Sequence, residues 1–123
     1  MQIAIFFAGV SLSIRKAKLV NLARLVLRKE RKKIARLNIV ITDNQHLREI
    51  NRKFLRKNRV TNVISFDMGD VAEIYVSKDR ARNKEELIYF IIHGLLHVIG
   101  YEHRNQRDEV LMEKKCFEYL EYV

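Results

Sequence analysis

The chain has 123 residues, of which 48% are hydrophobic and 32% charged, with no proline and one cysteine. This length and hydrophobic content are typical of one folded domain with its own core, and they exclude a disordered or low-complexity chain. A single cysteine, Cys116, cannot form an internal disulfide, which excludes a disulfide scaffold and favours the reducing cytoplasm.

The charge is strongly polarised along the chain. The 24 Lys and Arg outnumber the 15 Asp and Glu, for a formal net charge of +9. Residues 15–59 hold 16 of these bases and three acids, whereas residues 60–123 hold eight bases and 12 acids. A basic half of this kind predicts a polyanionic partner, nucleic acid ahead of a membrane. The alternative is an ordinary solvated surface.

The first half of the chain alternates between strand and helix patterns. Residues 1–10 are apolar, lack a basic start and are too few to span a membrane, so we expect a buried strand rather than a signal peptide. Ser13 is placed to cap a helix over residues 14–31, and residues 36–42 alternate as a strand does. The apolar stripe of the helix is Leu19, Leu22, Ala23 and Val26.

A short helix is predicted next, with Asp43 as its N-cap. Its apolar face consists of Leu47, Ile50 and Phe54. His46 lies outside that face, so we expect it at the surface. A hairpin pattern follows, in which the β-rich residues 61–66 and 72–77 flank a turn rich in Asp and Gly.

Two helix patterns complete the chain. Asn83 and Glu86 have the spacing of a capping box, which opens an almost wholly apolar helix through Ile99. A last helix, residues 105–122, has a core stripe of Met112, Cys116, Tyr119, Leu120 and Val123. The order β-α-β-α-β-β-α-α predicts an α+β fold in a single domain, residues 1–123, with about four helices packed on a small mixed sheet of about four strands.

Three of the four histidines fall in one short segment, as His93, His97 and His103. At about 3.6 residues per turn, the first two lie one above the other on the same helix face. Gly100 can end the helix in the left-handed conformation, which lets the chain bring the third histidine back. Because burying three imidazoles without a partner is costly, this spacing predicts a zinc site, one Zn²⁺ per chain, with an open fourth position.

The spacing of the histidines and the glycine is similar to that of the metzincin peptidases, which predicts a zincin-like, metal-bearing central helix. In those enzymes a general-base glutamate directly follows the first histidine, and here that position is Gly94. The nearest carboxylate to the histidines in the sequence is Glu102, a candidate base or a partner of a metal ligand.

Three segments resemble, in the same order, the YbeY family of rRNA maturation factors, which are metal-dependent endoribonucleases. The strongest match is residues 93–103 (HGLLHVIGYEH), where the family usually has Asp at the position of Glu102. Residues 61–66 (TNVISF) and 72–77 (AEIYVS) resemble two strands of that family.

The resemblance implies a metal-dependent, single-strand-specific endoribonuclease that acts in maturation of the small-subunit rRNA 3′ end and in ribosome quality control. The three-histidine spacing predicts that its metal is zinc, so we expect a zinc-dependent endoribonuclease. Its partners would be single-stranded RNA, rRNA and the small ribosomal subunit. The family also has an arginine a few residues before the first of the two strands, as a phosphate-binding or catalytic group. The resemblance assigns that role to Arg56, with Arg59 as the alternative.

Two other hypotheses stay open. One is a metalloprotease-like hydrolase, against which the glycine after His93 argues. The other is a non-catalytic module that binds RNA or the ribosome and has a structural zinc, which would normally need four protein ligands. Cys116 is the only other soft ligand, and its place in the core stripe of the last helix argues against that role.

Overall fold

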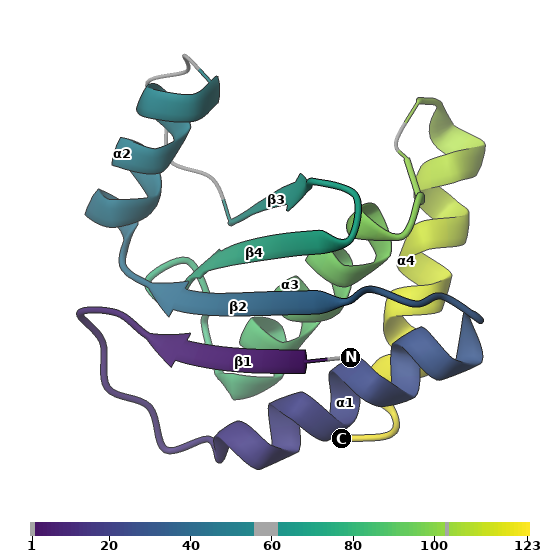
Figure 1. Ribbon diagram of the computed structural model, residues 1–123, viewed down its shortest axis with the longest axis horizontal. Coiled ribbons are helices and arrows are strands. Elements are labelled where there is room, and N and C mark those ends of the chain that lie inside the picture. The colour runs from purple at the N-terminus through teal and green to yellow at the C-terminus, as the bar shows by residue number, and fades with distance from the viewer. Residues whose placement is uncertain (1, 56–61, 103) are drawn as a thin grey trace.

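The computed structural model of the chain describes residues 2–55, 62–102 and 104–123. Within these ranges the elements follow the expected order (Figure 1). They are β1 (Gln2–Phe7), α1 (Lys16–Lys29), β2 (Arg36–Thr42), α2 (Asn44–Leu55), β3 (Val63–Asp67), β4 (Val71–Ser77), α3 (Lys84–Val98) and α4 (Gln106–Leu120).

The strands form one four-stranded mixed sheet in the order β1-β2-β4-β3. β1, β2 and β4 are parallel, whereas β3 pairs antiparallel with β4. Parallel neighbours need long crossovers, and α1 and α2 lie in those connections. The tight turn between β3 and β4 has Gly69 at a φ of 83°, and the Gly69 N–H donates to the Asp67 carboxylate at 3.0 Å. The predicted α+β fold and the antiparallel hairpin are confirmed.

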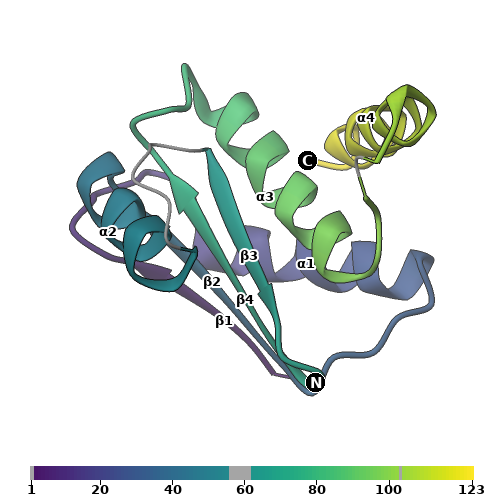
Figure 2. The same cartoon turned by 90° about the horizontal axis from the view of Figure 1, so that it is seen from above.

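Helices cover the sheet on both faces (Figure 2). α1 and α3 lie on one face with α4 packed outside α3, and α2 lies on the other face. The alternation of β2 accounts for the face that α1 and α3 cover, because Leu37, Ile39 and Ile41 are fully buried in one core with these helices. None of the helices in the described ranges is long and apolar enough to cross a membrane.

Two expectations near the N-terminus are wrong. β1 is an edge strand in which only Ile5 is buried, so the apolar start of the chain is half exposed rather than a buried strand. α1 begins at Lys16 and not at residue 14, with Arg15 as an N-cap whose side chain makes no capping hydrogen bond. Ser13 is therefore not the cap. The predicted apolar stripe of α1 is buried as expected.

The start of α2 agrees with the sequence, since the Asp43 carboxylate accepts a hydrogen bond from the His46 backbone N–H at 2.8 Å. Phe54 is 62% exposed rather than in the core, and its ring lies edge-to-face with the ring of Phe66, at a centroid distance of 5.9 Å. His46 is not a simple surface residue. Its side chain is partly buried, and its Nδ1 lies 2.8 Å from Thr42 Oγ1.

The cap predicted for α3 is confirmed in part, and α4 has a cap that was not predicted. Asn83 caps α3 by accepting from the Glu86 N–H at 2.9 Å. The return half of the capping box is absent, because the Glu86 carboxylate instead accepts from the backbone and guanidinium of Arg82. Asn105 caps α4, and Val123 lies beyond that helix and is 38% exposed, outside the core where we expected it.

Candidate metal centre

The candidate site begins with two histidines on one face of α3. His93 and His97 are four residues apart, which places them one turn apart on the helix. Their ring centroids are 4.8 Å apart, and their Nε2 atoms face each other at 3.1 Å. Both side chains are partly exposed, although most of the helix around them is buried. The predicted juxtaposition of these two imidazoles is confirmed, with access from solvent.

The end of α3 sets the orientation of the second histidine. The helix ends in a Schellman motif, in which the Gly100 N–H donates to His97 O at 3.1 Å and the Tyr101 N–H donates to Leu96 O at 2.9 Å. Gly100 has a φ of 114°, which only glycine adopts without strain. The turn was predicted from this glycine, and it carries the chain back over the last turn of the helix.

One consequence of the turn is a defined tautomer for His97. Its Nδ1 lies 3.0 Å from the backbone carbonyl oxygen of Tyr101. A carbonyl oxygen can only accept, so Nδ1 is the nitrogen that carries the proton in the neutral ring. The Nε2 lone pair is then directed at His93. Ligand histidines in metal sites are commonly held by such a hydrogen bond on the other nitrogen.

The donor set fits a zinc ion. Zinc binds imidazole nitrogen at about 2.0–2.1 Å in tetrahedral sites, so two such nitrogens lie about 3.3 Å apart. The observed 3.1 Å between the Nε2 atoms of His93 and His97 is close to that value. The described residues therefore bring together two of the three predicted ligands in suitable geometry, and His103 lies outside those residues.

The other predicted site residues are not tested by the geometry. Arg56 and Arg59 fall in 56–61, outside the described ranges. Glu102 is exposed after the Schellman turn, where its carboxylate pairs with Arg104 Nε at 2.8 Å. Its predicted role beside the histidines stays a prediction.

Gly94 has a structural role that its place in the motif did not indicate. It faces the sheet, and a Cβ there would lie 2.7 Å from Ile74 Cγ2 and 2.9 Å from Val63 Cγ2. The Gly94 carbonyl oxygen also accepts a hydrogen bond from Ser65 Oγ at 3.1 Å. α3 approaches β3 and β4 closely at this point because the residue lacks a side chain. A glutamate could not replace it without displacing the helix.

Cys116 is part of the core, as expected, and not of the metal centre. It is fully buried on α4, where burial raises the pKa of its thiol to about 12. Burial likewise raises the pKa of the neighbouring Tyr89 hydroxyl to about 12. A thiol that stays protonated at neutral pH is a poor zinc ligand, because the thiolate is the binding form.

The bases of α1 and α2, which belong to the basic half of the sequence, do not lie on one surface. Those of α1 are exposed on the side of the sheet that carries α3, whereas those of α2 lie on the opposite side (Figure 2). The exposed bases of the two helices are Lys16, Lys18, Arg24, Arg28 and Lys29 on α1, and Arg48, Arg52 and Lys53 on α2. Eight of the 16 bases of residues 15–59 therefore lie on two helices that flank the sheet, and whether either helix binds RNA stays a prediction.

A histidine pair on a central helix, packed on a mixed four-stranded sheet, defines this chain as an α+β protein with a candidate metal centre. Comparison with known proteins then identifies its family. The family model described as "Endoribonuclease YbeY" matches residues 9–123. The chain belongs to the YbeY family.

Curated relatives and a solved structure agree with this assignment. The chain is 36% identical to "Endoribonuclease YbeY" of Flavobacterium psychrophilum over 78% of each chain. It is 32% identical to the protein of the same name from Aquifex aeolicus, over 89% of this chain and 82% of that one. The solution structure of TM1509 from Thermotoga maritima is similar at a TM-score of 0.60 and 27% identity, covering 96% of this chain and 88% of that one.

Proposed function

We propose that this protein is a zinc-dependent endoribonuclease that cleaves single-stranded RNA in ribosomal RNA maturation. The observation that carries the proposal is the pair of Nε2 atoms of His93 and His97, 3.1 Å apart on a solvent-accessible face of α3. Membership of a family named for endoribonuclease activity supports the reaction class. The histidine pair supports this face of α3 as the place where the reaction occurs.

Each proposed site residue has a distinct task. His93 and His97, with His103 as the third ligand, would hold the zinc and leave one position open. When bound, zinc lowers the pKa of a coordinated water to about 7 and withdraws charge from a phosphoryl oxygen. Arg56, or Arg59 as the alternative, would bind the phosphate through two parallel hydrogen bonds. Glu102 is the candidate to accept the proton of the attacking water.

The biological substrate is inferred from the resemblance and from charge. Residues 15–59 carry 16 bases against three acids, which supports an RNA backbone as the partner. The resemblance of residues 61–66, 72–77 and 93–103 supports rRNA of the small ribosomal subunit, its 3′ end above all, and a part in ribosome quality control. A part in rRNA maturation supports the cytoplasm as the site of the proposed activity.

A cleavage assay on three substrates tests this function. We expect the zinc-loaded protein to cut single-stranded RNA, to leave duplex RNA largely intact and to leave casein, an unstructured protein, undigested. A chelator should abolish RNA cleavage, and added Zn²⁺ should restore it. Casein hydrolysis would favour the peptidase-like alternative. RNA binding without cleavage, in protein that holds its zinc, would favour the non-catalytic module.

Affinity for single-stranded RNA should fall steeply with salt, because each neutralised phosphate releases counterions. If Arg56 and Arg59 each contact a phosphate, the double variant Arg56→Glu/Arg59→Glu should change the slope of log affinity against log salt. The slope should become less steep by about 1.4, or about 0.7 per contact. The measurement is fluorescence anisotropy across a salt series.

The matched control reverses two exposed bases of the acidic half, Arg107 and Lys114 on α4. Arg107→Glu/Lys114→Glu makes the same change in net charge and should leave the slope nearly unchanged. Equal slopes for both double variants would show that residues 56 and 59 have no special part in binding.

A further inference from the structure

Glu30 is a carboxylate in an unfavourable place. It is the C-cap of α1, where the negative end of the helix dipole disfavours an acidic side chain. Its side chain is only 13% exposed. A carboxylate kept at such a position needs partners that offset the cost.

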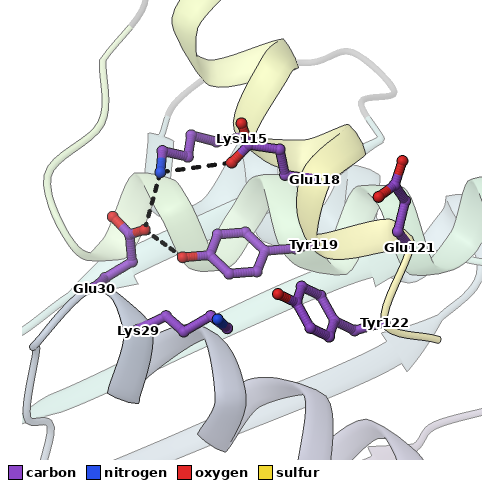
Figure 3. Close-up of a pocket in the computed structure, with 7 residues that line it drawn as sticks. All are labelled: Lys29, Glu30, Lys115, Glu118, Tyr119, Glu121 and Tyr122. Carbon is purple, nitrogen blue, oxygen red and sulfur yellow. Dashed lines mark hydrogen bonds and ion pairs between the residues drawn. The ribbon is translucent and has the colours of Figure 1, made fainter.

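Those partners come from the turn after α3 and from α4. The Tyr101 hydroxyl donates to Glu30 Oε1 at 2.7 Å, and the Tyr119 hydroxyl donates to Oε2. Lys115 Nζ approaches Oε2 at 3.8 Å (Figure 3). Burial, followed by the hydrogen bond to Glu30, raises the pKa of both tyrosines, so both hydroxyls remain donors at neutral pH.

The two tyrosines differ in their other contacts. Tyr119 is on the core face of α4. Tyr101 is bound at both ends, because its hydroxyl is held by Glu30 and its carbonyl oxygen lies 3.0 Å from His97 Nδ1. Two hydrogen bonds, joined by the covalent frame of Tyr101, therefore link Glu30 to the imidazole whose Nε2 faces His93.

We propose that Glu30 is a positioning residue for the candidate metal centre: by holding the Tyr101 hydroxyl, it fixes the carbonyl oxygen that keeps His97 protonated on Nδ1 and directs its Nε2 at His93. The zinc part of this inference rests on the proposed function. The tautomer part does not, because it concerns the metal-free protein. Outer hydrogen bonds of this kind typically change metal affinity by about 10–100-fold.

The chain offers a matched pair of variants. Tyr101→Phe and Tyr119→Phe each remove one hydroxyl that donates to the same carboxylate, and each retains the ring. Only Tyr101 is linked to His97. Both variants should lower the melting temperature by similar amounts. A difference between them in the tautomer of His97 then reports the connection through Tyr101 rather than a general loss of stability.

The first readout is the tautomer of His97 in metal-free, ¹⁵N-labelled protein, observed by long-range ¹H–¹⁵N NMR at a pH of about 8, where an ordinary imidazole is neutral. Wild type and Tyr119→Phe should show the Nδ1-protonated form. Tyr101→Phe and Glu30→Ala should shift the two ring nitrogens toward the averaged values of exchanging tautomers. This readout does not depend on zinc binding or RNA cleavage.

The second readout is zinc affinity by competition with a chromophoric chelator. Tyr101→Phe and Glu30→Ala should each weaken it about 10-fold, at the lower end of the range for outer hydrogen bonds, and Tyr119→Phe should change it by less than about twofold. The double variant Glu30→Ala/Tyr101→Phe should be no weaker than either single variant, since both break the same link between Glu30 and His97.

Two results would overturn the inference. One is an unchanged His97 tautomer in both Tyr101→Phe and Glu30→Ala. The other is an equal loss of zinc affinity in Tyr101→Phe and Tyr119→Phe, which would make Glu30 a structural residue only. If wild type binds no zinc, the proposed function fails, and the tautomer measurement still decides whether Glu30 orients His97.

Discussion

Replacing His97 with alanine should remove both zinc and RNA cleavage. The wild-type protein should bind about one zinc per chain, as three-histidine sites do. His97→Ala removes one of two nitrogens that lie 3.1 Å apart, so metal content should fall to a small fraction of the wild-type value. Cleavage of single-stranded RNA should fall more than about 100-fold, beyond the range for residues that only support a ligand. Metal analysis and a single-turnover assay measure the two effects.

His46→Ala is the matched control. It removes the one other described histidine, which is on α2, the helix on the far side of the sheet from α3, and whose Nδ1 lies 2.8 Å from Thr42 Oγ1. It should cost about 1 kcal/mol of stability for the lost hydrogen bond and leave zinc content and RNA cleavage intact. If His93→Ala/His97→Ala retains full metal, or if His46→Ala loses as much activity as His97→Ala, the assignment of the metal centre is wrong.

Substitution of Gly94 should destabilise the fold rather than create a peptidase. A Cβ at this position would lie 2.7 Å from Ile74 Cγ2 and 2.9 Å from Val63 Cγ2, in a well-packed region. Overpacking costs up to about 3 kcal/mol, and the better helix propensity of alanine returns about 1 kcal/mol. Gly94→Ala should therefore lose about 2 kcal/mol in urea unfolding. Gly94→Glu also buries a carboxylate, and a loss above about 4 kcal/mol should leave little folded protein.

A double-mutant cycle checks the cause of that loss. Val63→Ala removes one of the two methyl groups that a Cβ would strike, so Val63→Ala/Gly94→Ala should be more stable than the sum of the single effects by at least about 0.5 kcal/mol. Strict additivity, or a Gly94→Ala variant as stable as wild type, would contradict the packing explanation. Hydrolysis of casein by a folded Gly94→Glu protein would contradict the expectation that this substitution does not create a peptidase.

Much of the fold follows from local spacing. The alternation of residues 36–42 matches β2 to the residue, and the Asp and Gly between β3 and β4 form the turn expected of them. Asn83 and Asp43 cap the helices that they precede. These predictions succeeded because strand alternation, caps and tight turns depend on residues only a few positions apart.

The closeness of the two histidines on α3 was predictable for the same reason. Residues four apart share a helix face whatever surrounds them, so the closeness of His93 and His97 needed no knowledge of the fold. The turn at Gly100 likewise depends on one glycine and its neighbours. The failures came where an element meets solvent. β1 proved to be an edge strand, and Phe54 proved to be exposed, because hydrophobic spacing does not say which strand ends a sheet or which helix turn extends beyond it.

Long-range contacts decided the rest. Tyr101 and Glu30 are 71 positions apart in the sequence, and their hydrogen bond exists only because the end of α1 packs beside the turn after α3. Gly94 acquires its role from Ile74 and Val63 on two other elements. The sequence by itself therefore predicts which side chains share one helix face, because the pitch of the helix fixes their spacing. The role of Glu30 beside His97 and the need for glycine at position 94 depend on how closely separate helices and strands pack. Local spacing in the sequence carries no information about the distance between such elements.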